Sequence, residues 1–322
     1  MEPRGNELIQ RYKENYKIPS DAHVTEQMIL THWELEKLLT QELLQSTPEK
    51  RWETFERCYT RLYSDLDWLN PLTGKTIQTS PSDRYGKWLK AIGSPPKSIY
   101  EIGSGTGEFI AYLAGNNFQC TGTEITRERG QKHLANTYPN LVWSTTDGVH
   151  LDKFEAHETF DVVLSNQVIE HLHPDDLETH MKGVLSILKG GGRYIFNTPH
   201  KYTGPHDISQ VFKLSTPRGM HLREYTYQEI VASIKKAGFH HIYYAFIPRQ
   251  LRTFLIHGKS NQLEQTRQAG EQYLCILLLV EKMLSIIPAH GLRSFCAKVL
   301  RKLGFFSDNI FLIAEKRINI CS

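Results

Sequence analysis

The sequence has few cysteines, little net charge and no long apolar run, and each of these limits narrows its function. Its five cysteines among 322 residues show no C-x-x-C spacing, which argues against a zinc site or a disulfide framework and fits a reducing cytoplasm. The 38 basic and 35 acidic residues nearly cancel, so charge gives no argument for nucleic-acid binding. The apolar run at 273–280 is too short to span a membrane, and residues 1–6 lack the apolar core of a secretory signal. We therefore expect a cytoplasmic protein with no nucleic-acid partner.

Three glycines at alternate positions follow an apolar segment and precede a helix-forming one. The segment Ser98–Glu108 reads S-I-Y-E-I-G-S-G-T-G-E. Glycine allows positive φ and lets a ligand lie directly on the peptide groups, and the N–H groups at a helix start favour a polar or anionic partner. We therefore expect a nucleotide-like ligand at the loop formed by Gly103, Ser104, Gly105, Thr106 and Gly107.

The spacing of these glycines distinguishes between nucleotides. A dinucleotide fingerprint, G-x-G-x-x-G, would need glycine where the chain has Glu108, which disfavours a nicotinamide-dependent oxidoreductase. An acidic residue, Glu101, stands just before the turn instead. The pattern Glu101-x-Gly103-x-Gly105-x-Gly107 resembles motif I of class I S-adenosylmethionine-dependent methyltransferases. The resemblance implies that Glu101 orders the loop and the methionine amino end of S-adenosyl-L-methionine, with the glycines beneath the cofactor.

Further elements of the family pattern follow in order along the chain. A strand predicted over 118–124 ends in Glu124, and a carboxylate at that place can accept both ribose hydroxyls. By resemblance, Ile125 lies against the adenine. After the next predicted strand come Asp147 and Gly148, and in the family an acid at this point reads the adenine amino group. We therefore assign these residues to cofactor binding.

The predicted strand over 160–165 opens into a polar segment, N-Q-V-I-E-H-L, that begins at Asn166. This segment resembles the small-molecule methyltransferases of ubiquinone and menaquinone biosynthesis, which often carry an acid–histidine pair here. The resemblance places Asn166 and Gln167 at the cofactor. An oxygen or nitrogen nucleophile must lose a proton to a group of near-neutral pKa, so His171 is the first candidate for a general base and His206 the second. Some such relatives are thought to hold a divalent ion near this turn, but Gln167 replaces an acid at one plausible position, and no metal is predicted.

Strands and helices alternate from about 97 to 199, and further strands are expected at 240–247 and 309–316. Between the fourth and fifth strands, a helix is expected from Pro174 to Lys189, where three glycines end it. Such alternation predicts an α/β fold, a Rossmann-like sheet of seven mostly parallel strands with helices on both faces. The predicted division is an N-terminal helical extension at 1–75, the cofactor-binding core at 76–248, a helical insert at 249–308, and the last strand and tail at 309–322.

Two regions lie outside this core. Before it, one helix is predicted over 22–45 and a second from Thr47, whose aromatic face either packs on the domain or covers the substrate as a lid: Trp52, Phe55, Tyr59 and Leu62. The insert at 249–308 is a helical cap over the active site, a homodimer surface, or an interfacial helix on a membrane.

The leading functional prediction is methyl transfer to a small molecule, with O-methylation in secondary-metabolite or glycan biosynthesis placed first. In-line displacement needs alignment and exclusion of water but no covalent intermediate. The chain lacks the proline pair that nucleic-acid amino-methyltransferases carry after the position of Asn166. N- or C-methylation stays open, as does a catalytically silent module that binds S-adenosylmethionine and a partner.

Overall fold

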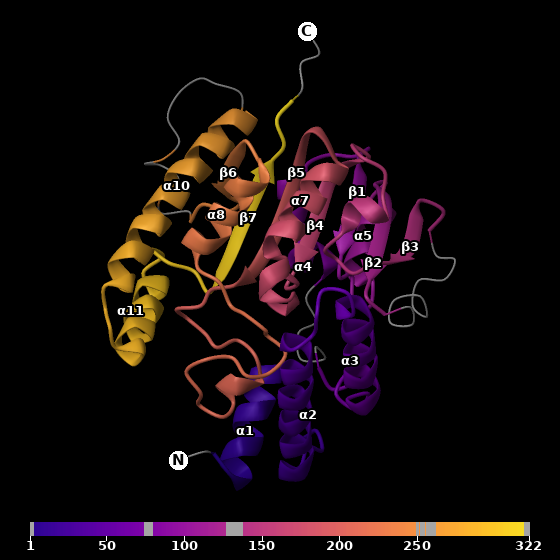
Figure 1. Ribbon diagram of the computed structural model, residues 1–322. Coiled ribbons are helices and arrows are strands. Elements are labelled where there is room, and N and C mark those ends of the chain that lie inside the picture. The colour runs from indigo at the N-terminus through magenta and orange to yellow at the C-terminus, as the bar shows by residue number, and fades with distance from the viewer. Residues whose placement is uncertain are drawn as a thin grey trace.

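The computed structural model describes residues 3–73, 80–126, 138–248, 251, 255 and 262–318. Its centre is one seven-stranded sheet in the order β3-β2-β1-β4-β5-β7-β6 (Figure 1). All neighbouring strands are parallel except β7, which runs antiparallel to both β5 and β6. The predicted fold class is confirmed. The strands are β1 (Ser98–Ile102), β2 (Gln119–Glu124), β3 (Leu141–Thr145), β4 (Phe160–Asn166), β5 (Leu188–Pro199), β6 (His241–Tyr244) and β7 (Asn309–Glu315).

Helices cover both faces of the sheet because successive strand residues point to opposite sides. On one face, Tyr100 and Val163 pack in a core with helices α7, α8 and α10. On the other face, Ile99 and Val162 pack with α4 and α5. The bounds of these helices are α4 (Pro81–Ile92), α5 (Glu108–Gly115), α7 (Leu177–Ile187), α8 (Tyr227–Ala237) and α10 (Gln262–Ser285).

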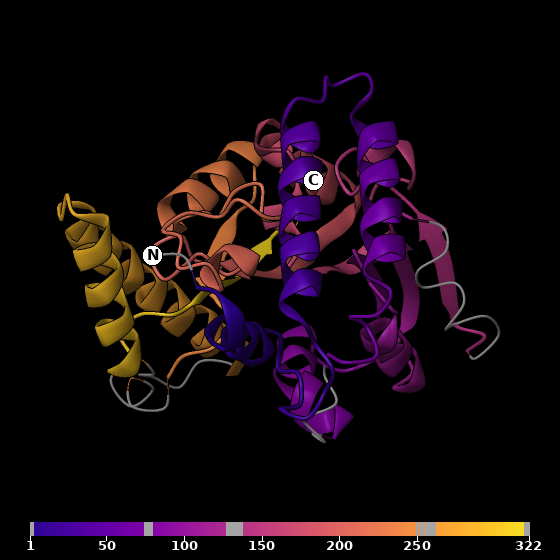
Figure 2. The same cartoon turned by 90° about the horizontal axis from the view of Figure 1, so that it is seen from below.

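Three N-terminal helices lie below the carboxyl ends of the parallel strands, as the view from below shows (Figure 2). They are α1 (Gly5–Tyr16), α2 (Glu26–Leu44) and α3 (Arg51–Asp65). The predicted helix at 22–45 starts four residues later, at Glu26, where the Thr25 hydroxyl accepts the backbone N–H of Met28 at 3.2 Å. The helix expected from Thr47 begins at Arg51, without a side-chain cap. The sequence reasoning did not predict α1.

The helix predicted to run to Lys189 ends earlier, at Ile187. The three glycines that were interpreted as a helix stop belong to β5, whose first residue, Leu188, pairs with Phe160 of β4. A register irregularity between Phe160 and Val162 lets the glycine-containing segment join the strand. Helix α8 begins with a capping box, in which the Thr226 hydroxyl accepts the backbone N–H of Glu229 and the Glu229 carboxylate accepts the backbone N–H of Thr226.

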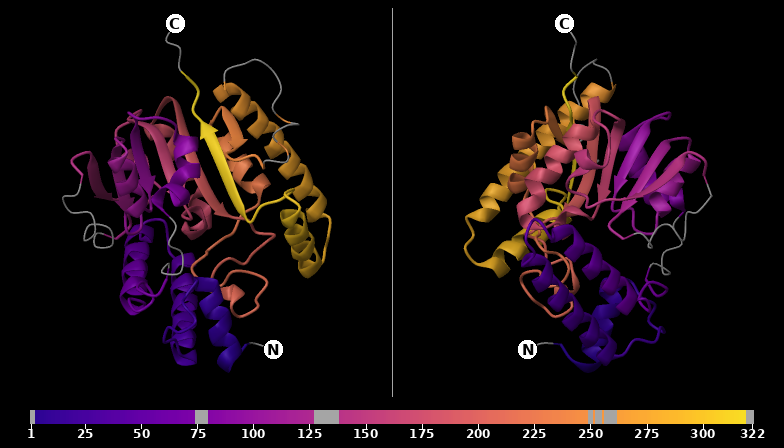
Figure 3. Two further views of the ribbon diagram at one scale, coloured as in Figure 1. Left: turned by 180° about the vertical axis from the view of Figure 1, so that it is seen from behind. Right: turned by 45° about the vertical axis from the view of Figure 1, so that its right-hand side comes forward.

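The region predicted as an insert contains α10 and α11 (His290–Lys302). Figure 3 shows both helices beside the β6–β7 edge of the sheet, and α10 packs on β6 and α8. Most of 249–261, and the proposed boundary at 75–76, lie outside the described residues. No helix in the described part of the chain is long and apolar enough to cross a membrane.

Candidate functional site

A cavity of about 390 Å³ opens at the carboxyl ends of the parallel strands. Its floor is formed by loops that follow β1, β2, β3 and β4, and its opposite wall is formed by α2 and α3. Nine of the predicted site residues line it: Gly103, Gly105, Glu124, Ile125, Asp147, Gly148, Asn166, Gln167 and His171. Ligands of open α/β sheets bind at this edge, so the cavity is the candidate active site.

The glycine loop after β1 has backbone angles that ordinary residues rarely adopt. Gly103, Gly105 and Gly107 have φ values of +67°, +59° and +78°. A Cβ added at Gly103 would lie 2.7 Å from Cγ2 of Val168, whereas one at Gly105 would meet nothing within 4 Å. Gly103 is therefore enclosed by the protein, whereas Gly105 presents bare backbone to the cavity.

Glu124 ties the glycine loop to the end of β2. Its Oε1 accepts the N–H of Gly105 at 2.8 Å, and its Oε2 accepts the N–H of Ile125 at 3.0 Å. Ser104 adds two contacts to β2, since its N–H donates to the carbonyl of Thr123 and its hydroxyl accepts the N–H of Thr123. These bonds place the Glu124 carboxylate at the cavity wall, where the ribose hydroxyls were predicted.

Glu101 is a buried carboxylate beneath this loop. Its Oε2 has no hydrogen-bond partner among the described residues. Burial raises the pKa of Glu101 to about 7, the Ser104 hydroxyl opposes that rise, and the nearby Glu124 carboxylate adds to it. A buried, unpartnered carboxylate is suited to a cationic group, and the amino group of S-adenosylmethionine fits that requirement.

Asp147 holds the turn after β3. Its Oδ1 accepts the N–H groups of Val149 and His150 at 2.8 and 2.9 Å, and its Oδ2 lies 2.7 Å from Nδ1 of His150. Asp147 and Ile125 line both the main cavity and a neighbouring hollow of about 680 Å³. Asp147 is thus a positioned acceptor at the junction of the two spaces.

His171 lies on the short 3₁₀ turn Ile169–His171 after β4, and its ring is half-exposed at the cavity. Its Nδ1 lies 2.9 Å from the carbonyl oxygen of Met220. Because a carbonyl only accepts, Nδ1 carries the proton, and Nε2 is the basic nitrogen of the neutral ring. The Tyr59 ring packs edge-on against His171, with 6.2 Å between ring centroids.

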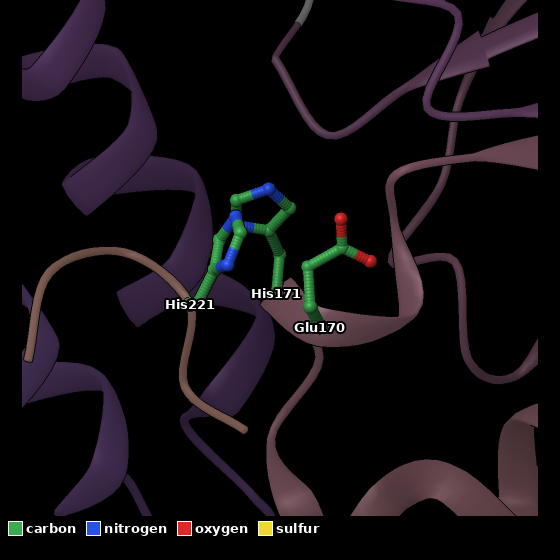
Figure 4. A group of neighbouring side chains, drawn as sticks. All are labelled: Glu170, His171 and His221. Atoms are coloured by element: carbon green, nitrogen blue, oxygen red, sulfur yellow. The ribbon is translucent and has the colours of Figure 1, made fainter. Parts of the chain in front are cut away.

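Glu170, His171 and His221 form a cluster whose possible ligand atoms lie within 4.8 Å of one another (Figure 4). The Thr198 hydroxyl donates to Oε2 of Glu170 at 2.9 Å, and Glu170 Oε1 has no described partner. Burial opposes a charged His221, but its hydrogen bond to Glu224 and the nearby carboxylates raise the pKa of His221 to about 9. A histidine that binds a metal must be deprotonated, so the ion pair of His221 with Glu224 disfavours a metal here. The absence of a metal stays a prediction.

His206 lies in the same network but does not line the cavity. Its ring Nε2 lies 3.1 Å from the Thr203 hydroxyl, and its backbone N–H donates to Oε1 of Glu224 at 2.6 Å. Burial lowers the pKa of His206. This position fits support for Glu224 rather than contact with a substrate, so we retain His171 alone as the candidate base. Glu101, Ser104, Thr106 and Gly107 also do not line the cavity, but they belong to the strand end and loop that form its floor.

The sequence reasoning identified part of the wall opposite the glycine loop but missed Glu36 and Tyr63. Phe55, Tyr59, Leu62 and Tyr63 of α3 line the cavity together with Glu36 of α2. The aromatic spacing on α3 was the available signal, and of its two interpretations the lid agrees with this lining.

A buried hydrogen-bond chain connects this N-terminal wall to the candidate base. The Tyr12 hydroxyl lies 2.7 Å from Nδ1 of His32, whose Nε2 lies 2.7 Å from Oε1 of Glu36. Glu36 Oε2 accepts the N–H of Met220 at 3.1 Å. Since the carbonyl of Met220 accepts from His171, the chain fixes the residue that orients the His171 ring.

Comparison with known proteins agrees with this geometry. Residues 78–244, half of the chain, match the model of a family described as "Methyltransferase domain". The chain belongs to this methyltransferase family, and the predicted S-adenosyl-L-methionine cofactor accords with that membership.

One curated relative and two solved structures illustrate the similarity. YqeM of Bacillus subtilis (strain 168), whose name carries a provisional methyltransferase assignment, is 27% identical over 143 residues, 42% of this chain and 55% of YqeM. The match therefore spans less than two thirds of that relative.

Phosphoethanolamine N-methyltransferase 2 of Haemonchus contortus is 14% identical over 84% of this chain and 61% of its own, with a TM-score of 0.50. A SAM-dependent methyltransferase from Archaeoglobus fulgidus is 16% identical over 73% of this chain and 92% of its own, with a TM-score of 0.46. At 14% identity, the similarity to the Haemonchus contortus enzyme concerns the fold alone.

Proposed function

We propose that this methyltransferase transfers a methyl group from S-adenosylmethionine to a hydroxyl of a small molecule, with His171 as general base. The observation that carries the proposal is the fixed orientation of His171, whose Nδ1–H donates to Met220 while the ring lines the cavity. An alcohol or phenol must lose its proton as it attacks, and a positioned imidazole meets that need near neutral pH. A neutral amine could attack without such a base.

The residues present fit the cofactor. The Glu101 carboxylate would hold the amino group, Glu124 the ribose hydroxyls, and Asp147 the adenine amino group, while Ile125 would contact the adenine face. The cofactor supplies an electrophilic methyl group on a sulfonium sulfur. Gly105 gives it bare backbone, and Gly148, Asn166 and Gln167 complete the cavity floor.

The acceptor would lie between this floor and the aromatic wall of α3. Tyr59 has a buried hydroxyl with no hydrogen-bond partner among the described residues. Burial raises the pKa of Tyr59 well above its ordinary value, so the hydroxyl stays a donor at neutral pH. We infer that it donates to the acceptor oxygen while His171 takes the proton. The cavity of about 390 Å³ and the adjoining hollow of about 680 Å³ are of a size suited to the cofactor and a small acceptor.

Two measurements on the full chain test this proposal. The first is calorimetric titration with S-adenosylhomocysteine, and the second is transfer of labelled methyl from S-adenosylmethionine to a panel of phenols, sugars, carboxylates and amines. We expect His171→Ala to lower turnover by at least about 100-fold and to leave S-adenosylhomocysteine affinity nearly unchanged.

A matched control is His240→Ala, which removes an exposed imidazole away from the cavity. It should change neither quantity. Equal loss of turnover and affinity in His171→Ala would make His171 a scaffold residue. Labelling of amines alone, unaffected by His171→Ala, would replace O-methylation with N-methylation.

A further inference from the structure

The outward face of α11 is apolar, which is the reverse of an ordinary surface helix. Leu292, Phe295, Val299 and Leu303, three or four residues apart, form one stripe with exposed fractions of 39–65%. The inward face carries the small residues Ser294 and Ala297, which are buried. These four apolar side chains are therefore not part of the core, whereas Leu300 of the same helix packs against it.

The neighbouring helix extends this stripe. On α10, Leu279 and Met283 are exposed by 60% and 64%, and Ile286 just beyond the helix is exposed by 77%. Their spacing of four and three residues places them on one face, and α10 packs against α11. We call the seven exposed side chains the outer patch: Leu279, Met283, Ile286, Leu292, Phe295, Val299 and Leu303. Scattered apolar residues are ordinary on a surface, but a grouped set marks an interaction site.

The charges close to the outer patch are mostly basic. Residues 272–307, all of which the structure describes, contain five basic residues: Lys282, Arg293, Lys298, Arg301 and Lys302. The one acid in this segment, Glu281, is buried, where it accepts the N–H groups of Tyr227 and Gln228. Residues 272–307 therefore expose basic side chains and no acid beside the apolar stripe. Asp308 pairs with Arg301 at the end of this segment, and the acids Glu264 and Glu271 lie on the first half of α10.

A groove of about 420 Å³ adjoins the stripe, between α11, the loop after β5 and α1. Phe295 and Lys298 of α11 line it together with the side chains of Arg11, Lys213 and His290. No acidic side chain is among its described lining residues. Lys213 pairs with Glu7, and Arg11 donates to the backbone carbonyls of residues 210 and 211. The side chains of Lys298 and His290 are therefore the groups of the groove that could bind an external anion.

We propose that the outer patch docks on a membrane surface that contains anionic lipids. The apolar stripe would enter the boundary between headgroups and acyl chains, and the flanking lysines and the groove would meet phosphate headgroups. A second copy of the chain fits less well. A two-fold contact brings each patch against itself, and here that would face basic groups with basic groups and no acid.

The position of the patch leaves the active site open. Among the described residues, none that lines the main cavity comes from 262–318. Figure 1 shows α10 and α11 at the opposite side of the molecule from β3. Docking through these helices would hold the enzyme at a membrane without blocking the cavity, and the interpretation of the insert as a cap is not supported by the lining.

Flotation of the full chain with vesicles tests the proposal. We expect binding to vesicles of phosphatidylcholine mixed with phosphatidylglycerol, weaker binding to pure phosphatidylcholine, and loss of binding as salt rises. Each lysine near an anionic surface contributes about 5-fold in affinity, so Lys298→Gln/Lys302→Gln should lose about 30-fold. Leu292→Gln/Phe295→Gln should lose at least about 100-fold in affinity for the vesicles, because two apolar side chains that would enter the membrane are replaced by polar ones.

Two exposed apolar residues elsewhere provide a matched control. Leu38 and Val142 are exposed by 50% and 61% and lie outside the insert, so Leu38→Gln/Val142→Gln should bind vesicles as the parent does. Light scattering across protein concentrations, without lipid, completes the design. Absence of vesicle binding, equal loss in the control, or a dimer that Leu292→Gln/Phe295→Gln dissolves would each overturn the membrane assignment.

Discussion

The buried carboxylate of Glu101 should make cofactor affinity depend on pH. Burial raises the pKa of Glu101 to about 7, so the carboxyl is mostly protonated at about pH 6 and mostly ionised at about pH 8. If only the ionised form holds the amino group of the ligand, the competent fraction rises about 10-fold between these values. Affinity for S-adenosylhomocysteine should therefore strengthen about 10-fold, or by about 1.4 kcal/mol.

Calorimetric titration with S-adenosylhomocysteine at the two pH values measures this change. Glu101→Gln should bind weakly and show almost no pH dependence, because an amide does not titrate. Glu170→Gln is the matched control, since burial also raises the pKa of Glu170 to about 7, and it should keep the parent's pH dependence. A flat profile in the parent, or a sloping one that survives in Glu101→Gln, would refute the assignment of Glu101 to the amino group.

Three further predictions concern stability and ligand binding. Gly103→Ala should lower the free energy of unfolding by at least about 1–2 kcal/mol in urea denaturation, because its Cβ would lie 2.7 Å from Val168 at a positive φ; equal stability would contradict the enclosed turn. Glu170→Gln should raise the free energy of unfolding, measured in urea, by about 1–3 kcal/mol over the parent at about pH 8, and by much less at about pH 5. The parent protein becomes less stable as pH rises from 4.5 to about 7, because the pKa of Glu170 is higher in the folded state than in the unfolded state. The amide side chain of the variant does not titrate, so the gain grows with pH; a gain that is constant with pH would contradict this reasoning. Gly105→Arg should abolish S-adenosylhomocysteine binding and leave the far-ultraviolet circular dichroism unchanged, since the space beside this glycine is open; retained affinity would show that the ligand binds elsewhere.

The residues proposed to bind the cofactor could be located from the sequence because they are local to strand ends. Glu101, Glu124 and Asp147 each stand at a fixed place after an apolar strand, and parallel strands bring such places to one edge. The loop glycines carry their own signal, since positive φ requires them. The Rossmann-like sheet of mostly parallel strands followed from the same alternation.

The acceptor side was not predictable because it depends on contacts between distant segments. The bond from His171 to Met220 joins residues 49 positions apart, and Glu36 reaches Met220 across 184 positions. No spacing in the sequence encodes such contacts. The early end of α7 has a similar cause, since pairing with β4 recruits Leu188 into a strand although the following glycines are typical of a helix stop.

The insert shows a third limit of sequence reasoning. Its apolar residues have helical spacing, which normally predicts the buried face. Packing instead places Ser294 and Ala297 inward, where α11 lies close to the protein, and leaves Phe295 outward. Periodicity identifies the stripe on a helix, but only the tertiary structure decides which way it faces.

The cavity is formed mainly by two parts of the chain, the strand ends of the sheet and the N-terminal helices. Residues 102–172 supply the floor at the strand ends, whereas α2 and α3 supply Glu36, Phe55, Tyr59, Leu62 and Tyr63 from a separate helical layer, and Met220 bonds to both parts. Substitutions in that layer can change the shape of the proposed acceptor site while the residues proposed to bind the cofactor keep their geometry. An enzyme built this way can acquire a new substrate through its first 65 residues alone, and grafting α1–α3 between relatives is the natural route to altered selectivity.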